Sequence, residues 1–140
     1  MKNYNTSTIQ TIARIVLGAF MLYAGIGHMT FLRGEFQAQV PHWVPLSKDI
    51  IVILSGVVEI VLGLGMIFLD RYKTIVGLSL ATFYILIFPG NIAQYVNGID
   101  AFGLDTDTKR LIRLFFQPVL IFWALWSTGA INVFKPDQSK

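Results

Sequence analysis

Four long stretches of the sequence carry almost no charge, and they limit what the chain can fold into. Between consecutive charged residues lie 18 uncharged residues at 15–32, 26 at 74–99 and 21 at 114–134, while the 20 residues at 50–69 carry a single charge, Glu59. A helix needs about 20 residues to cross the ~30 Å hydrocarbon core of a bilayer, where lipid offers the backbone no hydrogen-bond partners. The sequence therefore predicts an all-α membrane protein, an antiparallel bundle of four transmembrane helices near 9–31, 50–69, 74–97 and 111–131.

The composition excludes other classes of protein. Of the 140 residues 54% are hydrophobic and only 14% are charged, whereas soluble domains have about 25% charged residues. We therefore expect one membrane domain over 1–140, with the lipid bilayer as its main partner. The 11 Lys and Arg residues are scattered along the chain, which does not favour nucleic-acid binding. Without cysteine, and with two histidines, the sequence predicts no disulfide, thiol chemistry or metal site.

The connections between the spans predict their arrangement. The four residues at 70–73 fit only a tight antiparallel turn, so the longer connections at 33–48 and 98–110 should lie together on the opposite face of the membrane. Basic residues are divided evenly between the two faces, and Arg14 tips the count toward cytoplasmic termini. The connection at 33–48 is too apolar for a free loop in water. It is either an anchor at the membrane surface, through Trp43, or a lid over a pocket between helices.

Glu59 is the polar residue expected deepest in the membrane, near the middle of the second span. A carboxyl group there must take up a proton or find a partner. Ser55, Glu59 and Gly63 are spaced by four residues, which predicts a face of small residues that another helix can approach closely. Two interpretations stay open: a ligand-binding, proton-exchanging or catalytic carboxyl group, or a structural hydrogen bond between helices.

Two other polar residues stand at the ends of spans one and three. His28 closes the first span and shares one helical stripe with Arg14, Gly18, Met21 and Gly25. Asn91 follows Pro89, which should kink the third span. Either residue could bind the polar group of a ligand. The alternatives are an interfacial role for His28 and repair of the broken helix by Asn91.

The fourth span opens with polar residues on one face. Arg110, Arg113 and Gln117 are spaced by three and four residues. Arg110 should extend toward the lipid headgroups, while Arg113 lies a turn deeper and could meet Glu59 or an anionic ligand. The antiparallel topology places the candidate ligand-binding residues in one half of the membrane, with Glu59 at the floor of a pocket open toward the long connections: His28, Glu59, Asn91, Arg113 and Gln117.

These segments together resemble the DoxX-like family of small four-helix integral membrane proteins. The resemblance covers roughly residues 12–128 and rests on residues 24–29, on Ser-Gly-x-x-Glu at 55–59, on Pro-x-Asn at 89–91 and on residues 110–118. It implies a protein of the cell inner membrane, often linked with redox systems. One branch of the family is similar to a membrane subunit of a thiosulfate:quinone oxidoreductase. We do not transfer the sulfur chemistry, because this chain is short and lacks cysteine.

The expected function is that of a membrane subunit or accessory of a quinone-linked redox system, with an oxidoreductase as partner and a quinone as non-covalent cofactor. Three alternatives remain. Glu59 and His28 could act as an acid/base pair of an enzyme on a lipid-like substrate. The chain could be a small proton-coupled carrier, which would need a homo-oligomer and could use Gly77 and Ala81 as its interface. Finally, the polar layer could be purely structural.

Overall fold

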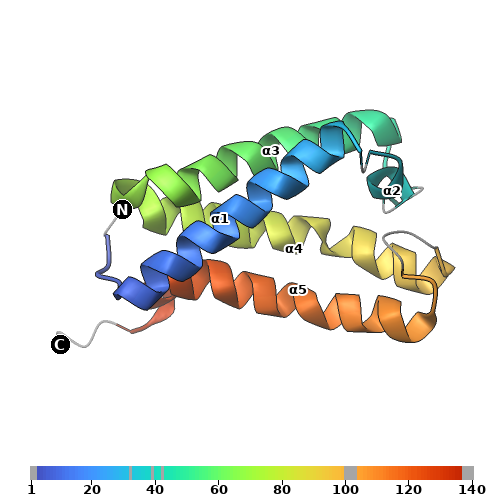
Figure 1. Cartoon of the computed structure of the whole chain (residues 1–140). Coiled ribbons are helices and arrows are strands. Elements are labelled where there is room, and N and C mark those ends of the chain that lie inside the picture. The colour runs from blue at the N-terminus through green and yellow to red at the C-terminus, as the bar shows by residue number, and fades with distance from the viewer. Residues whose placement is uncertain (1–2, 32, 39, 42, 100–103, 137–140) are drawn as a thin grey trace.

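The protein is a bundle of four long helices in the computed structural model, which describes residues 3–31, 33–38, 40–41, 43–99 and 104–136 (Figure 1). The long helices are α1 (Thr8–Met29), α3 (Lys48–Phe68), α4 (Lys73–Asn97) and α5 (Asp107–Ser127), and the short ones are α2 (Arg33–Ala38), η1 (Asp70–Tyr72) and η2 (Ala130–Phe134). Within the described part, four helices are long and apolar enough to cross a membrane. The predicted all-α bundle is confirmed, and its architecture is that of a multi-pass membrane protein.

Capping residues decide where the helices begin and end. The side chain of Ser7 accepts a hydrogen bond from the backbone of Gln10 at the start of α1, and Ser47 caps α3 in the same way. Thr106 caps α5, so this helix begins at Asp107, four residues before the expected boundary. It ends at Ser127 and not near 131, because Gly129 adopts a left-handed conformation (φ 75°) that stops the helix. The apolar stretches alone did not reveal the polar capping residues at the ends of the helices.

The closest helix pair is α1 and α3, which touch through glycine. A Cβ atom added at Gly18 would lie 2.9 Å from the carbonyl oxygen of Gly63, and one added at Gly25 would lie 2.8 Å from that of Gly56. The two contacts are seven residues apart on both helices, so they repeat along one face. The expected stripe on α1 is buried as predicted. On α3 the small-residue face runs through Gly56 and Gly63, and Ser55 lies half-buried beside it.

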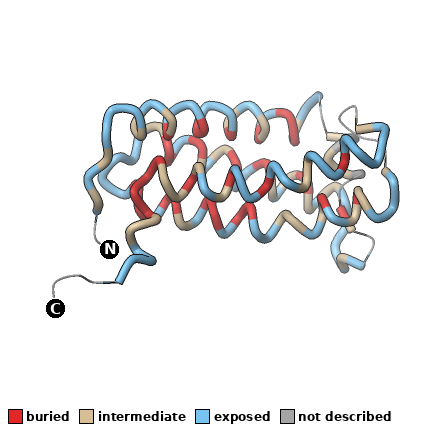
Figure 2. Tube along the Cα trace, turned by 90° about the horizontal axis from the view of Figure 1, so that it is seen from below, coloured by how far each residue is buried: buried red, intermediate tan, exposed pale blue. Residues whose placement is uncertain are grey.

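The other contacts close the bundle. α4 runs beside α5 over most of its length (Figure 1), and both helices continue through their prolines, Pro89 and Pro118. α1 is tied to the end of α5 by two bonds to backbone oxygens: Trp123 Nε1 donates to Ala13 at 2.9 Å and Gln10 Nε2 donates to Trp126 at 2.7 Å. The inward faces are buried and the outward faces exposed (Figure 2).

Two expectations about surfaces need correction. Gly77 and Ala81 do not lie on the surface, because both are buried inside the chain, where Gly77 packs against Thr128. This pair is therefore not available as an interface with a second copy. The connection at 33–48 contains a helix, α2, that was not expected. Val40 of this connection is buried, whereas Trp43 is 74% exposed. The connection thus both packs on the bundle and presents an aromatic ring outward.

We expect Gly63→Ala to destabilise the protein by about 1–3 kcal/mol, because the new methyl group would lie 2.8 Å from the carbonyl oxygen of Gly18. Thermal unfolding in detergent measures the effect. Gly34→Ala is the control, since a Cβ atom there has no neighbour within 4 Å. Equal stability of the two variants would contradict the proposed backbone contact.

Candidate functional site

His28 and Glu59 form a buried pair where α1 meets α3. Nε2 of His28 lies 3.0 Å from Oε2 of Glu59, and the two residues are 6% and 5% exposed. Neither of these two atoms has another hydrogen-bond partner. Gly56 permits the contact, because a Cβ atom at Gly56 would lie 2.8 Å from Cβ of His28. The predicted close approach of a helix to Glu59 is confirmed, and the residue it delivers is His28.

The second ring nitrogen of His28 fixes where its proton lies. Nδ1 is 3.1 Å from the carbonyl oxygen of Val52. A carbonyl oxygen can only accept, so Nδ1 must carry the hydrogen, and the neutral ring leaves Nε2 as an acceptor. Glu59 then approaches this acceptor either as a carboxylic acid or, once the proton has moved to Nε2, as a carboxylate beside a charged imidazole. The pair is built to hold one exchangeable proton.

α2 covers this pair at the end of the bundle where α1 gives way to the connection (Figure 1). The ring of Phe36 lies on the imidazole of His28, with ring centroids 3.4 Å apart. Asp49, at the start of α3, holds α2 in place: it forms a two-point ion pair with Arg33 and accepts a bond from Gln37 Nε2 at 2.8 Å. Each of the two interpretations of this connection fits one residue. Phe36 covers the ring of His28, as a lid would, and Trp43 is exposed, as an anchor would be.

The remaining three candidates form a second cluster between α4 and α5. Oε1 of Gln117 accepts from Asn91 Nδ2 at 3.3 Å and from Arg113 Nη1 at 3.0 Å. Nε2 of Gln117 donates to the carbonyl oxygen of Tyr84 at 2.7 Å. Asn91 therefore links two helices and does not repair its own. Arg113 also lies over the ring of Phe116, and no carboxylate of the described residues pairs with it.

The predicted layer of five residues is thus divided into two clusters. No ion pair joins Arg113 to Glu59 in the described part of the chain. Tyr84 stands between them: its hydroxyl group contacts Sδ of Met21 at 3.0 Å, and it lies within electrostatic range of both Glu59 and Arg113. Sequence reasoning missed Tyr84, although it precedes Asn91 by seven residues and so lies on the same helical face.

Arg110 differs from its expected position. Its side chain is not extended outward but is buried, donating to the carbonyl oxygen of Leu104 at 2.8 Å and pairing with Asp107 at 2.9 Å. The guanidinium group thus folds back on the start of its own helix.

The opposite end of the bundle holds another group of charges, around the turn between α3 and α4. Asp70 pairs with Arg14 at 3.1 Å and with Lys73 at 3.7 Å. Arg14 is 3% exposed, and its Nε and Nη1 atoms have no hydrogen-bond partner. The sequence placed Arg14 on one stripe of α1 but did not connect it with Asp70, which is 56 residues away in the chain.

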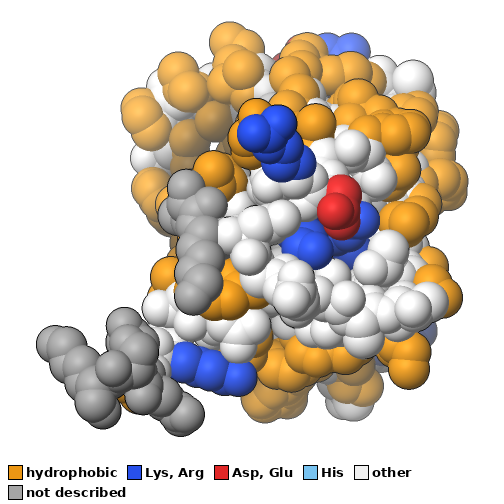
Figure 3. Space-filling model, turned by 90° about the vertical axis from the view of Figure 1, so that its left-hand side faces the viewer, with side chains coloured by type: hydrophobic (Ala, Val, Ile, Leu, Met, Phe, Trp, Pro, Cys, Tyr) orange, Lys and Arg blue, Asp and Glu red, His pale blue; other side chains and the backbone are white. Residues whose placement is uncertain are grey.

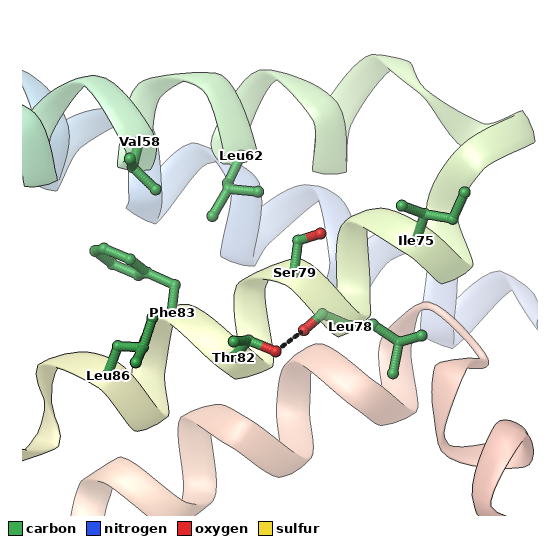
Figure 4. A pocket seen from close by; sticks show the side chains of 8 residues that line it. All are labelled: Val58, Leu62, Ile75, Leu78, Ser79, Thr82, Phe83 and Leu86. Atoms are coloured by element: carbon green, nitrogen blue, oxygen red, sulfur yellow. Dashed lines mark hydrogen bonds between the residues drawn. The ribbon is translucent and has the colours of Figure 1, made fainter.

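An apolar groove lies outside both clusters of candidate residues. It has a volume of about 550 Å³ and opens between α3 and α4, and its lining is apolar except for Ser79 and Thr82 (Figure 4). None of the five candidates lines it. Among the described residues no three His, Asp or Glu side chains come together to hold a metal ion. His42 lies outside the described residues.

Comparisons with known proteins identify one family. A family model described as a domain of unknown function, DUF8561, matches residues 17–128, a segment that includes all five candidate residues. No curated protein matches the chain, and no solved structure does.

We expect nitrogen-15 NMR of the protein in detergent to show hydrogen on Nδ1 of His28 in every charge state, because Val52 accepts from it. Gly56→Ala should remove this signature by displacing His28. Gly63→Ala, at the other glycine contact, should keep it. A neutral ring with hydrogen on Nε2 in the wild-type protein would contradict the assignment.

Proposed function

We propose that this chain, which belongs to the DUF8561 family, is a membrane subunit or accessory of a redox system and binds the polar head of a lipid-soluble carrier such as a quinone. The observation that carries the proposal is the contact of 3.0 Å between the buried side chains of His28 and Glu59. Ionisable groups at membrane depth are costly, and they mark sites of ligand or proton exchange.

The chemistry of the pair fits such a carrier. Reduction of a quinone to a quinol adds two electrons and two protons, so its binding site needs a hydrogen-bond donor at a carbonyl oxygen and a group that can replace the donated proton. Glu59 and His28 share one exchangeable proton, as the bond from Nδ1 to Val52 requires. The pair can act as general acid for one proton at a time, and a proton from water must then restore it before a second transfer.

The second cluster supplies further donors. Arg113 carries a charge that no carboxylate of the described chain neutralises, and its Nη1 atom shares the oxygen of Gln117 with Asn91. A carbonyl or anionic oxygen of a ligand would be a favourable partner for this guanidinium group. In this proposal His28 and Glu59 exchange the proton, while Asn91, Arg113 and Gln117 orient the head group.

The resemblance to the DoxX-like family supports the cellular setting of the proposal. We place the chain in the inner membrane with both termini in the cytoplasm, which Arg14 favours by the positive-inside rule. An oxidoreductase that reduces or oxidises the carrier would be the partner, and a homo-oligomer would need a surface other than Gly77 and Ala81.

The same pair of residues favours one other function, an enzyme that uses His28 and Glu59 as acid and base on a lipid-like substrate. Conversion of such a substrate without an electron acceptor would distinguish it. A carrier is less well supported, because the apolar side chains of Leu17, Met21 and Met66 are buried between the two polar ends of the bundle and leave no polar path through it.

We expect gently purified wild-type protein to retain a quinone or quinol, and Glu59→Gln to retain less, because the amide cannot exchange the proton. Mass spectrometry of extracted small molecules measures both. Asp105→Asn is the matched control: Asp105 is exposed, and its hydrogen bond with Lys109 lowers its pKa, so the change also removes a carboxylate. Bulk phospholipid as the sole extract from all three proteins would contradict the proposal.

We expect Phe36→Ala to speed the release of the retained molecule, because the ring that covers His28 is removed. The measurement is the loss of bound quinone during exchange into fresh detergent. Trp43→Ala removes an exposed ring from the same connection and should leave the rate unchanged. Equal rates for the two variants would show that α2 does not cover the entrance.

A further inference from the structure

We propose that the end of the bundle opposite to His28 and Glu59 binds an anionic phospholipid, with its headgroup at the turn between α3 and α4 and an acyl chain in the groove beside it. Two hollows adjoin there. A polar recess of about 260 Å³ is lined by Asn3, Arg71, Tyr72, Thr74 and Ile75. The apolar groove between α3 and α4 also begins at Ile75, so one residue lines both.

The groove has the dimensions and chemistry of an acyl-chain site. It runs along α4 from Ile75 to Leu86, a rise of about 16 Å, with Val58 and Leu62 of α3 forming the facing wall (Figure 4). The hydroxyl group of Thr82 donates to the carbonyl oxygen of Leu78 at 2.9 Å. An apolar occupant of the groove therefore leaves this donor satisfied.

The recess carries an excess of positive charge. Asp70 is the carboxylate of this turn, and it already pairs with Arg14 and Lys73. Arg71 lines the recess, and its one contact with a described residue is the ring of Tyr72, 5.9 Å away. Three cations and one carboxylate are thus gathered at this turn. The view onto this end shows basic side chains around an acidic one, surrounded by hydrophobic side chains (Figure 3).

The charge of the recess and the apolar lining of the groove together indicate which class of molecule can bind. A free anion would satisfy Arg71 but leave the groove open, and a neutral lipid would fill the groove but leave the charge unmatched. A second copy of the chain could cover the groove, but it would leave the charge of Arg71 unmatched unless it placed a carboxylate in the recess. An amphiphile with a phosphodiester headgroup matches both parts, because its charge and its hydrocarbon are joined at the membrane surface, where the recess and groove meet.

The test is native mass spectrometry of the full chain released from mixed micelles of equal phosphatidylglycerol and phosphatidylcholine. We expect wild-type protein to retain phosphatidylglycerol preferentially. Arg71→Gln should lower this preference by about fivefold, the effect of one basic residue near an anionic lipid surface. Ser79→Trp, which fills the groove, should lower the retention of both lipids.

Two controls match these variants. Lys135→Gln removes an exposed charge near the C-terminal end without touching the recess, and Ala19→Trp adds the same bulk to an exposed position of α1. Both should behave as wild type. The proposal is overturned if wild type retains the two lipids equally, if either variant matches its control, or if the groove is covered by a second copy in a lipid-free dimer.

Discussion

The contact of two backbones at Gly56 and Gly25 is the constraint on which the candidate site depends. Any side chain at Gly56 would meet Cβ of His28, and the imidazole could then not reach both Val52 and Glu59. In a bilayer the hydrophobic effect does not drive helices together, so close packing of small residues must supply much of the attraction. The same glycines therefore stabilise the bundle and bring an ionisable pair together inside it.

Features that depend on residues close together in the sequence could be predicted, whereas features that depend on distant residues could not. The four long helices follow from uncharged stretches, their antiparallel order from the short turn at 70–73, and the stripe on α1 from its spacing by three and four residues; the structure contains all three. The boundary of α5 was four residues late, because the cap at Thr106 precedes the apolar run. α2 was missed because six residues with Gly34 among them give no helical period, and its position depends on Asp49, 16 residues after Arg33.

The sequence grouped the five candidate residues too broadly. All five were chosen as polar residues within apolar spans, yet topology fixes only the half of the bundle in which a residue lies. Which side chains touch depends on rotation of each helix about its axis. The structure therefore separates His28 and Glu59 from Asn91, Arg113 and Gln117. The carbonyl groups of Val52 and Tyr84, which orient both clusters, give no signal in a sequence.

The polar clusters at the two ends of the bundle have different surroundings. Polar clusters occupy both ends, and a core that includes Leu17, Leu80 and Leu120 separates them. At one end, the ring of Phe36 in α2 lies on the imidazole of the buried pair. The turn at Asp70 faces outward and can bind a ligand at the surface without disturbing that pair. A lipid bound at the turn would then leave the contact between His28 and Glu59 unchanged, because the apolar core lies between the two ends.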